Sequence, residues 1–250
     1  MDEEGLALGV CVNSQVLASS SKKRTYTKSP EDREWVSIVE TVSAAGRKIR
    51  PLIIFKGKDL QSSWFPHDNI PEWFYTSSEK GWTSNNVAFE WLQRIFLVDT
   101  VPKNSIGRIL VLDGHGSHIT VDFLYTCKVN NVHLVFLPAH SSHVLQPLDL
   151  SCFSPIKLRY RQQIASLASL DDSVKIKKHR FIEYYHCARE ESLTERVIRA
   201  GWKASGISPW NPEKAYASSQ VKGKPKDKPT TPPRPKHVQI PLDPLLSTPK

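Results

Sequence analysis

Cysteine is scarce in this sequence, and no two cysteines stand close enough to form a C-x-x-C motif. This spacing excludes a zinc knuckle built on cysteines and a dense disulfide framework. We therefore expect reduced thiols in an intracellular protein. The four cysteines are Cys11, Cys127, Cys152 and Cys187.

Long apolar runs are also missing. The longest, such as residues 51–55, fall far below the roughly 20 residues of a membrane-spanning helix, so we expect no membrane partner. The first residues include Asp2, Glu3 and Glu4, where a secretory signal would carry basic residues. We therefore expect no such signal.

What the sequence does contain is an ordinary globular composition with a basic excess. Of its 250 residues, 39% are hydrophobic and 24% are charged, which excludes collagen and a wholly disordered chain. The net charge is +9, and residues 218–250 contribute +5 of it through seven Lys/Arg and two Asp. This balance is compatible with a polyanionic partner such as nucleic acid.

Composition divides the chain into one predicted domain, residues 1–217, and a tail, residues 218–250. The tail has eight prolines and no aromatic residue, so it cannot bury enough apolar surface to offset the entropy of ordering. We predict that it is disordered. The lysine-rich residues 222–228 are interpreted either as a weak nuclear-import signal or as a solvated linker.

Hydrophobic patterns predict an α/β domain with a mixed sheet flanked by helices. The predicted strands are 35–42, 49–55, 108–113 and 132–137. A short turn at Gly46 separates the first two strands, which favours an antiparallel hairpin. The last two strands flank a helix over 120–128, capped by Thr120, and this spacing suits a parallel crossover. Further predicted helices are 85–96, with Asn85 or Asn86 as N-cap, 148–170, 179–189 and 194–204.

Two acids follow the predicted parallel strands. Asp113 ends one strand and precedes a glycine, so it can cap the turn or bind a metal at the carboxyl end of the strand. Asp149 stands where a helix begins, and an acid there also stabilises the helix N-terminus. One strand–helix–strand crossover lies between them, so we expect the two carboxylates to meet and share Mg²⁺ or Mn²⁺. Asp2 is a candidate third ligand.

Two H-x-x-H pairs stand beside these acids. His115 and His118 follow the first acid, and His140 and His143 precede the second. Four imidazoles could bind zinc. The alternatives are hydrogen bonds to neighbouring carboxylates and loops, contact with a phosphate, or an inert hydrogen-bonded role.

An ordered set of motifs includes D-G-H-G-S-H at 113–118 and Q-P-L-D at 146–149. Over residues 1–217 this set resembles the DDE superfamily endonuclease domain of pogo-like transposases, in the mariner/pogo group. The other segments that carry the resemblance are 1–5, Gly46 with 51–58, 80–83, Trp91, Phe96, 137–143, Phe153, Lys157, Tyr160, 201–202 and 206–212.

The resemblance implies an RNase H-like fold with a helical C-terminal extension. It also implies that Asp2, Asp113 and Asp149 hold two Mg²⁺ or Mn²⁺ ions for DNA cleavage and strand transfer, with Asp113 bridging the ions. The four histidines would then support these ligands. By the family pattern, the strand that holds Asp2 is expected to be largely missing, as is the N-terminal helix-turn-helix region. We therefore expect a truncated or decayed element, or a gene model that starts late.

DNA is the partner that this resemblance implies, with a nuclear location and a possible homo-oligomer on DNA. No small-molecule substrate is expected. All seven tryptophans are interpreted as core or loop anchors, and none is assigned to DNA. The cations expected to contact phosphates are Lys56, Lys58, Lys80, Lys157, Arg159 and Arg161.

Three alternatives remain open from the sequence. The first is a domesticated or decayed protein that binds DNA or chromatin without catalysis. The second is a zinc hydrolase that uses the histidines. The third is a pseudogene product that never folds.

Overall fold

The computed structural model describes residues 1–8, 34–102, 104, 106–114, 120–168 and 178–218. The predicted tail, apart from Ser218, lies outside these residues. The strands are β1 (Asp2–Ala7), β2 (Trp35–Glu40), β3 (Leu52–Lys56), β4 (Phe74–Ser78), β5 (Arg108–Leu112) and β6 (Val132–Phe136). The helices are α1 (Asn85–Trp91), α2 (Leu97–Asp99), α3 (Val121–Val129), α4 (Ser142–Leu145), α5 (Phe153–Ala168), α6 (Lys178–Ser192), α7 (Glu195–Ser205) and α8 (Glu213–Tyr216). The shorter helical segments are the 3₁₀ turn η1 (Ser62–Trp64) and the π-helical η2 (Leu92–Phe96) and η4 (Leu148–Cys152).

The strands form two ladders that meet at the start of β1. One ladder has the order β1-β2-β3-β4, in which β2 is antiparallel to β1 and β3, and β4 is parallel to β3. The other ladder pairs β5 and β6 in parallel. The amino nitrogen of Met1 donates a hydrogen bond to the carbonyl of Val111 (3.1 Å), so β1 begins beside β5. The strands together make a mixed sheet.

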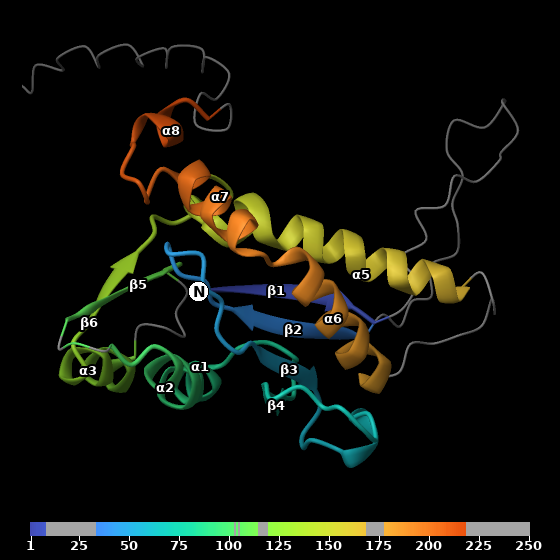
Figure 1. The fold of residues 1–250 in the computed structure, drawn as a ribbon. Helices are drawn as coiled ribbons and strands as arrows, with labels where there is room; N and C mark the ends of the chain where they lie inside the picture. Colours follow the sequence, from blue (N-terminus) through green and yellow to red (C-terminus); the bar gives the residue numbers. More distant parts are fainter. Residues whose placement is uncertain (9–33, 103, 105, 115–119, 169–177, 219–250) are drawn as a thin grey trace, which may run out of the picture.

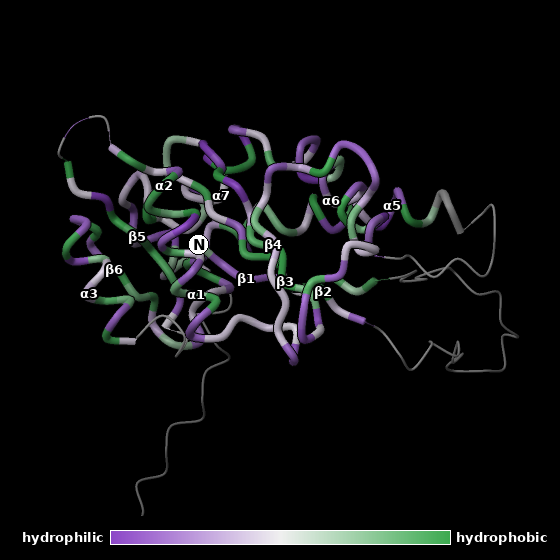
Figure 2. Tube along the Cα trace, turned by 90° about the horizontal axis from the view of Figure 1, so that it is seen from below, coloured by the Kyte–Doolittle hydropathy of each residue, from purple (hydrophilic) through white to green (hydrophobic). Residues whose placement is uncertain are grey.

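Helices cover both faces of this sheet (Figure 1). Val36, Ile38 and Ile53 pack against η4, α5, α6 and α7 on one face. Val39 and Ile54 pack against α1, η2 and α3 on the other face. Because side chains alternate along a strand, β2 and β3 supply both cores and are apolar on both faces. Figure 2 shows β3 and β5 as hydrophobic stretches of the trace. The predicted mixed sheet flanked by helices is confirmed.

Local sequence signals account for several elements. The predicted hairpin is confirmed: β2 and β3 pair antiparallel, and Gly46 occupies the intervening turn with φ +87°, which favours glycine. Thr120 caps α3 as predicted, since its side chain accepts a hydrogen bond from the amide of Phe123. The parallel crossover from β5 through α3 to β6 is also confirmed.

Three details differ from the sequence-based expectations. Ser84 caps α1 in place of Asn85 or Asn86, because its hydroxyl accepts the amide hydrogen bond of Val87. The helix expected over 85–96 continues as the π-helical η2, and the helix expected from Leu148 begins as the π-helical η4. Finally, the strand of Asp2, expected to be largely missing and followed by a loop, is the six-residue β1.

A buried ion pair ties α6 to the end of β2. Arg189 donates to both carboxylate oxygens of Glu40, at 2.7 and 3.0 Å, and the Tyr185 hydroxyl donates to Glu40 at 2.7 Å. The Glu40 side chain is 0% exposed, and that of Arg189 is 4% exposed. Arg189 also donates to the carbonyl of Ile49. Every charge in this cluster has a partner, as burial in a low-dielectric interior requires.

We predict that Arg189→Met lowers the free energy of unfolding by about 3–5 kcal/mol, because it leaves a buried carboxylate without its cation. The control is Arg199→Met, which breaks the exposed pair with Glu195 and should cost less than about 1 kcal/mol. Urea unfolding followed by circular dichroism measures both values. Equal losses in the two variants would contradict this account of the buried pair.

Candidate metal centre

Asp2 lies at the start of β1, where neighbouring acids and burial act on its carboxyl group. Burial and, next, the charge of Asp149 raise the pKa of Asp2 to about 7. The amino group of the chain and a hydrogen bond from the amide of Glu3 (2.9 Å) act in the opposite direction, and Asp113 adds repulsion. Asp2 therefore lies within electrostatic range of both other predicted ligands.

Asp113 directly follows β5, at the carboxyl end of a strand that pairs in parallel with β6. The position of this end is fixed from two sides. Val111 accepts the hydrogen bond from Met1, and the carbonyl of Leu112 accepts one from the amide of Leu137 (2.9 Å). Burial lowers the pKa of the Met1 amino group to about 6, while the charges of Asp2 and Asp113 oppose this shift. The second predicted ligand thus lies within electrostatic range of the first.

Asp149 is carried by the π-helical η4. Loss of hydration, the charge of Glu4 and the charge of Asp113 raise the pKa of Asp149, whereas Lys157 and His143 lower it. A π-helical turn inside a longer helix is often found at a functional site, because it re-aims side chains that a regular helix would place elsewhere. All three predicted acids therefore repel at least one other member of the group.

Three contacts hold η4 in place. The amide of buried Gln146 donates to the carbonyl of Met1 (3.0 Å), which links the segment before η4 to β1. On the other side, α7 approaches so closely that a Cβ on Gly201 would lie 2.3 Å from the carbonyl oxygen of Pro147. Only a hydrogen atom fits there. Ser151 adds a hydrogen bond to the carbonyl of Val197 (2.8 Å).

The arrangement brings carboxylates together without completing a coordination shell. Among the described residues, no group of three or more His, Cys, Asp or Glu side chains stands in a geometry that would hold a metal ion. The donor chemistry nevertheless fits a hard divalent cation, since the groups that converge are carboxylates whose mutual repulsion such a cation would remove.

The predicted histidines differ in their placement. His143 lies in α4, is exposed, and its charge acts on Asp149. His140 is exposed in the preceding loop with φ +60°, a conformation uncommon for residues with side chains. His115 and His118 lie outside the described residues. Only His143 is therefore seen to act on an acid of the group.

The predicted DNA-contacting cations fall into two sets. Lys157 forms an ion pair with Glu4 (2.8 Å), and Arg159 lies 3.7 Å from a carboxylate oxygen of Glu191. The others are exposed and form no ion pair with any residue in the described part of the chain. They are Lys56, Lys58, Lys80 and Arg161.

Sequence reasoning missed two residues of this site. Glu4 was not singled out, although it raises the pKa of Asp149 and binds Lys157. Gln146 was quoted only as part of a motif, although its side chain joins two of the acid-bearing segments. The available signal for Gln146 in the sequence was a polar residue directly before the Pro-Leu-Asp start of a helix.

Comparisons with known proteins place the chain in a family. A sequence profile described as DDE superfamily endonuclease matches residues 32–202. The human Pogo transposable element with KRAB domain is 24% identical over 202 residues, which cover 76% of this chain and 32% of that protein. The human Pogo transposable element with ZNF domain is 23% identical over 151 residues, 60% of this chain and 10% of that protein.

A fungal relative is more similar in sequence. The MFS-type transporter clz9 of Cochliobolus lunatus is 33% identical over 223 residues, 88% of this chain and 24% of that protein. Its name refers to a transporter, whereas no helix in the described part of this chain is both long and apolar enough to cross a membrane. By the shares given for clz9 and the two Pogo proteins, this chain spans a third or less of the length of each of these relatives.

The fold also has a solved counterpart. The crystal structure of the Mos1 strand transfer complex matches 90% of this chain and 54% of that chain, with a TM-score of 0.55 and 13% identity. This likeness confirms the predicted RNase H-like fold, a mixed sheet flanked by helices. The profile match and the Pogo relatives show that the chain belongs to the DDE superfamily endonuclease family, as a pogo-like domain.

Proposed function

We propose that the domain cleaves and transfers DNA strands with two divalent metal ions, Mg²⁺ or Mn²⁺, held by Asp2, Asp113 and Asp149. The observation that carries this proposal is the placement of three carboxylates, at the start of β1, directly after β5 and in η4, within electrostatic range of one another. Burial, followed by the charges of Asp149 and Asp113, raises the pKa of Asp2 to about 7. Divalent cations would supply activation of a water or DNA hydroxyl and stabilisation of the leaving oxygen.

The residues of the chain have distinct parts in this proposal. Asp113, directly after β5, would hold the ions together with the other two acids. His143, which already acts on Asp149, would orient that carboxylate, and His140 lies in the loop before α4. Lys157 partly neutralises Glu4 and keeps the surrounding charge from growing more negative. His115 and His118 complete the proposed set of supporting histidines.

Phosphate contacts follow from the exposed cations. Lys56, Lys58, Lys80 and Arg161 are free to bind a DNA backbone, and Lys157 and Arg159 would do so by exchanging their carboxylate partners. We further propose a nuclear location, a homo-oligomer on DNA, and a division into the domain 1–217 and the basic tail 218–250. The Mos1 complex is titled a strand transfer complex, which supports DNA as the partner.

We predict that Asp113→Asn abolishes Mn²⁺ binding and Mg²⁺-dependent nicking of duplex DNA, because removal of one charge breaks the shared ligand set. The matched control is Asp59→Asn, an exposed acid beyond the end of β3. That end of β3 lies at the end of β1 opposite Met1 in the strand register, so the change should affect neither property. Titration calorimetry and gel assays measure the two. Nicking by Asp113→Asn at the wild-type rate would rule out the assignment.

Metal binding should also depend on pH. The pKa of Asp2 is raised to about 7, so the metal-free protein holds a proton there below that pH, and a cation must displace it. We predict that Mn²⁺ affinity rises between about pH 6 and about pH 8, with release of a proton. Calorimetry in buffers of different ionisation enthalpy counts that proton. In Asp2→Asn the pH dependence should flatten; a wild-type affinity that stays constant over this range would refute the prediction.

A further inference from the structure

Two exposed tryptophans lie against β1 close to the acids. Trp35 is 46% exposed and Trp82 is 52% exposed. A Cβ on Gly5 would lie 3.3 Å from Cη2 of Trp82 and 3.4 Å from Cε3 of Trp35, so both rings contact one spot of the backbone. Gly5 is three residues along β1 from Asp2. Large aromatic rings are costly to leave in water, so two at one place suggest a binding surface.

The turn that presents Trp82 is held firmly. Gly81 has φ +74°, and its carbonyl accepts a hydrogen bond from the buried hydroxyl of Ser37 (2.7 Å). On the other side of Trp82 in the sequence, the amide of Thr83 donates to the carboxylate of Glu3 (3.3 Å). The backbone that carries the exposed ring is thus held in place before any ligand arrives, which lowers the entropy lost on binding.

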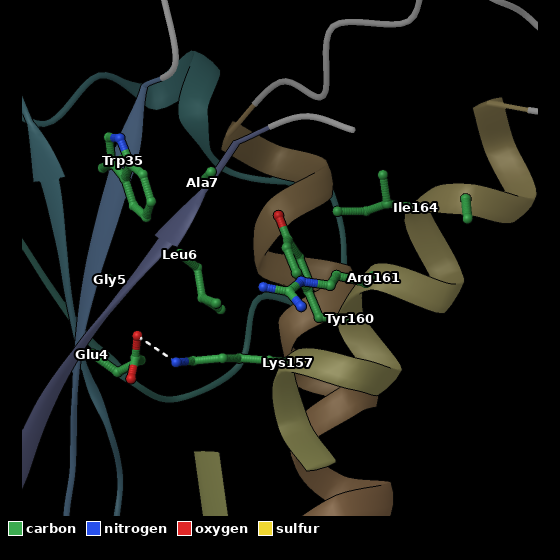
Figure 3. A pocket seen from close by; sticks show the side chains of 10 residues that line it. Glu4, Gly5, Leu6, Ala7, Trp35, Lys157, Tyr160, Arg161 and Ile164 are labelled. Carbon is green, nitrogen blue, oxygen red and sulfur yellow. Dashed lines mark ion pairs between the residues drawn. The ribbon is translucent and has the colours of Figure 1, made fainter. Parts of the chain in front are cut away.

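A cavity of about 180 Å³ lies beside the same strand, between β1 and α5 (Figure 3). Trp35 also lines it, together with Arg161 of α5. Arg161 is exposed and forms no ion pair with any described residue, whereas Lys157 forms an ion pair with Glu4. The strand is therefore flanked by two aromatic rings and by one arginine that has no carboxylate partner among the described residues.

We propose that Trp35, Trp82 and Arg161 bind unpaired nucleotides of a DNA strand that leads to the acid group. Indole rings stack on the faces of bases, and these faces are accessible only where a strand is not stacked in a duplex. The guanidinium binds the phosphates of the same strand. The proposal rests on the proposed function, and it changes the sequence-based interpretation, which assigned no tryptophan to DNA.

The test compares two labelled decamers of equal charge. One is a thymidine decamer, and the other carries abasic sites in place of the bases. Fluorescence anisotropy with the full chain, at low salt and with EDTA, measures both affinities. Wild type should prefer the thymidine decamer by at least about fivefold, the factor for stacking one base.

The variants separate stacking from charge. Trp82→Ala and Trp35→Ala should each lose most of the preference, and Trp82→Phe should keep part of it. The control is Trp210→Ala, which removes an indole that is 78% exposed near α8 and should leave the preference unchanged. Arg161→Gln should weaken both decamers alike. Thermal melts show which variants remain folded.

The outcomes distinguish this inference from the function on which it rests. Equal affinity of wild type for the two decamers, or an unchanged preference in Trp82→Ala and Trp35→Ala, overturns the inference. A Mn²⁺ titration of the same proteins in buffer without EDTA tests the proposed metal site separately. A preference for thymidine in a wild-type protein that binds no Mn²⁺ would support the stacking site and reject the metal site.

Discussion

The candidate site depends on the anchoring of a single residue, Met1. Its amino nitrogen bonds to Val111, and its carbonyl accepts the side-chain amide of Gln146. These two hydrogen bonds join the start of β1 to β5 and to the segment before η4. The three acids follow these anchors by one, two and three residues, so the hydrogen bonds determine where the carboxylates lie. Because Gln146 is buried, loss of either partner would leave an unpaired polar group, which costs more than the bond contributes.

The negative charges of two acids on neighbouring strands, Asp2 on β1 and Glu40 on β2, are balanced in different ways. Asp2 and Glu40 are partners in the register of β1 and β2. Glu40 is neutralised by Arg189, so the repulsion that Asp2 experiences comes from the other two acids and not from its register partner. The buried pair thus keeps the strand end in place, while the acids beside it keep a surplus of negative charge for which a cation is the natural counterpart.

The sequence predicts the elements better than it predicts the contacts between them. Short apolar runs, Gly46 and Thr120 suffice for the hairpin and the crossover, because these signals act within a few residues. The gathering of Asp113 and Asp149 follows from crossover topology alone. The pairing of Glu4 with Lys157 is different, because it depends on how α5 lies against β1. The exposure of Trp82 likewise depends on a turn that Ser37 holds from another strand.

The two hydrogen bonds of Met1 also have a consequence for folding. They join residues separated by 110 and 145 positions, so they form only after long loops have closed. The β2–β3 hairpin and the β5–α3–β6 crossover are far more local, and contacts of that kind form sooner. We therefore expect the acid group to assemble last and to open first. Hydrogen exchange at β1 would then report on the competence of the site while most of the core stays protected.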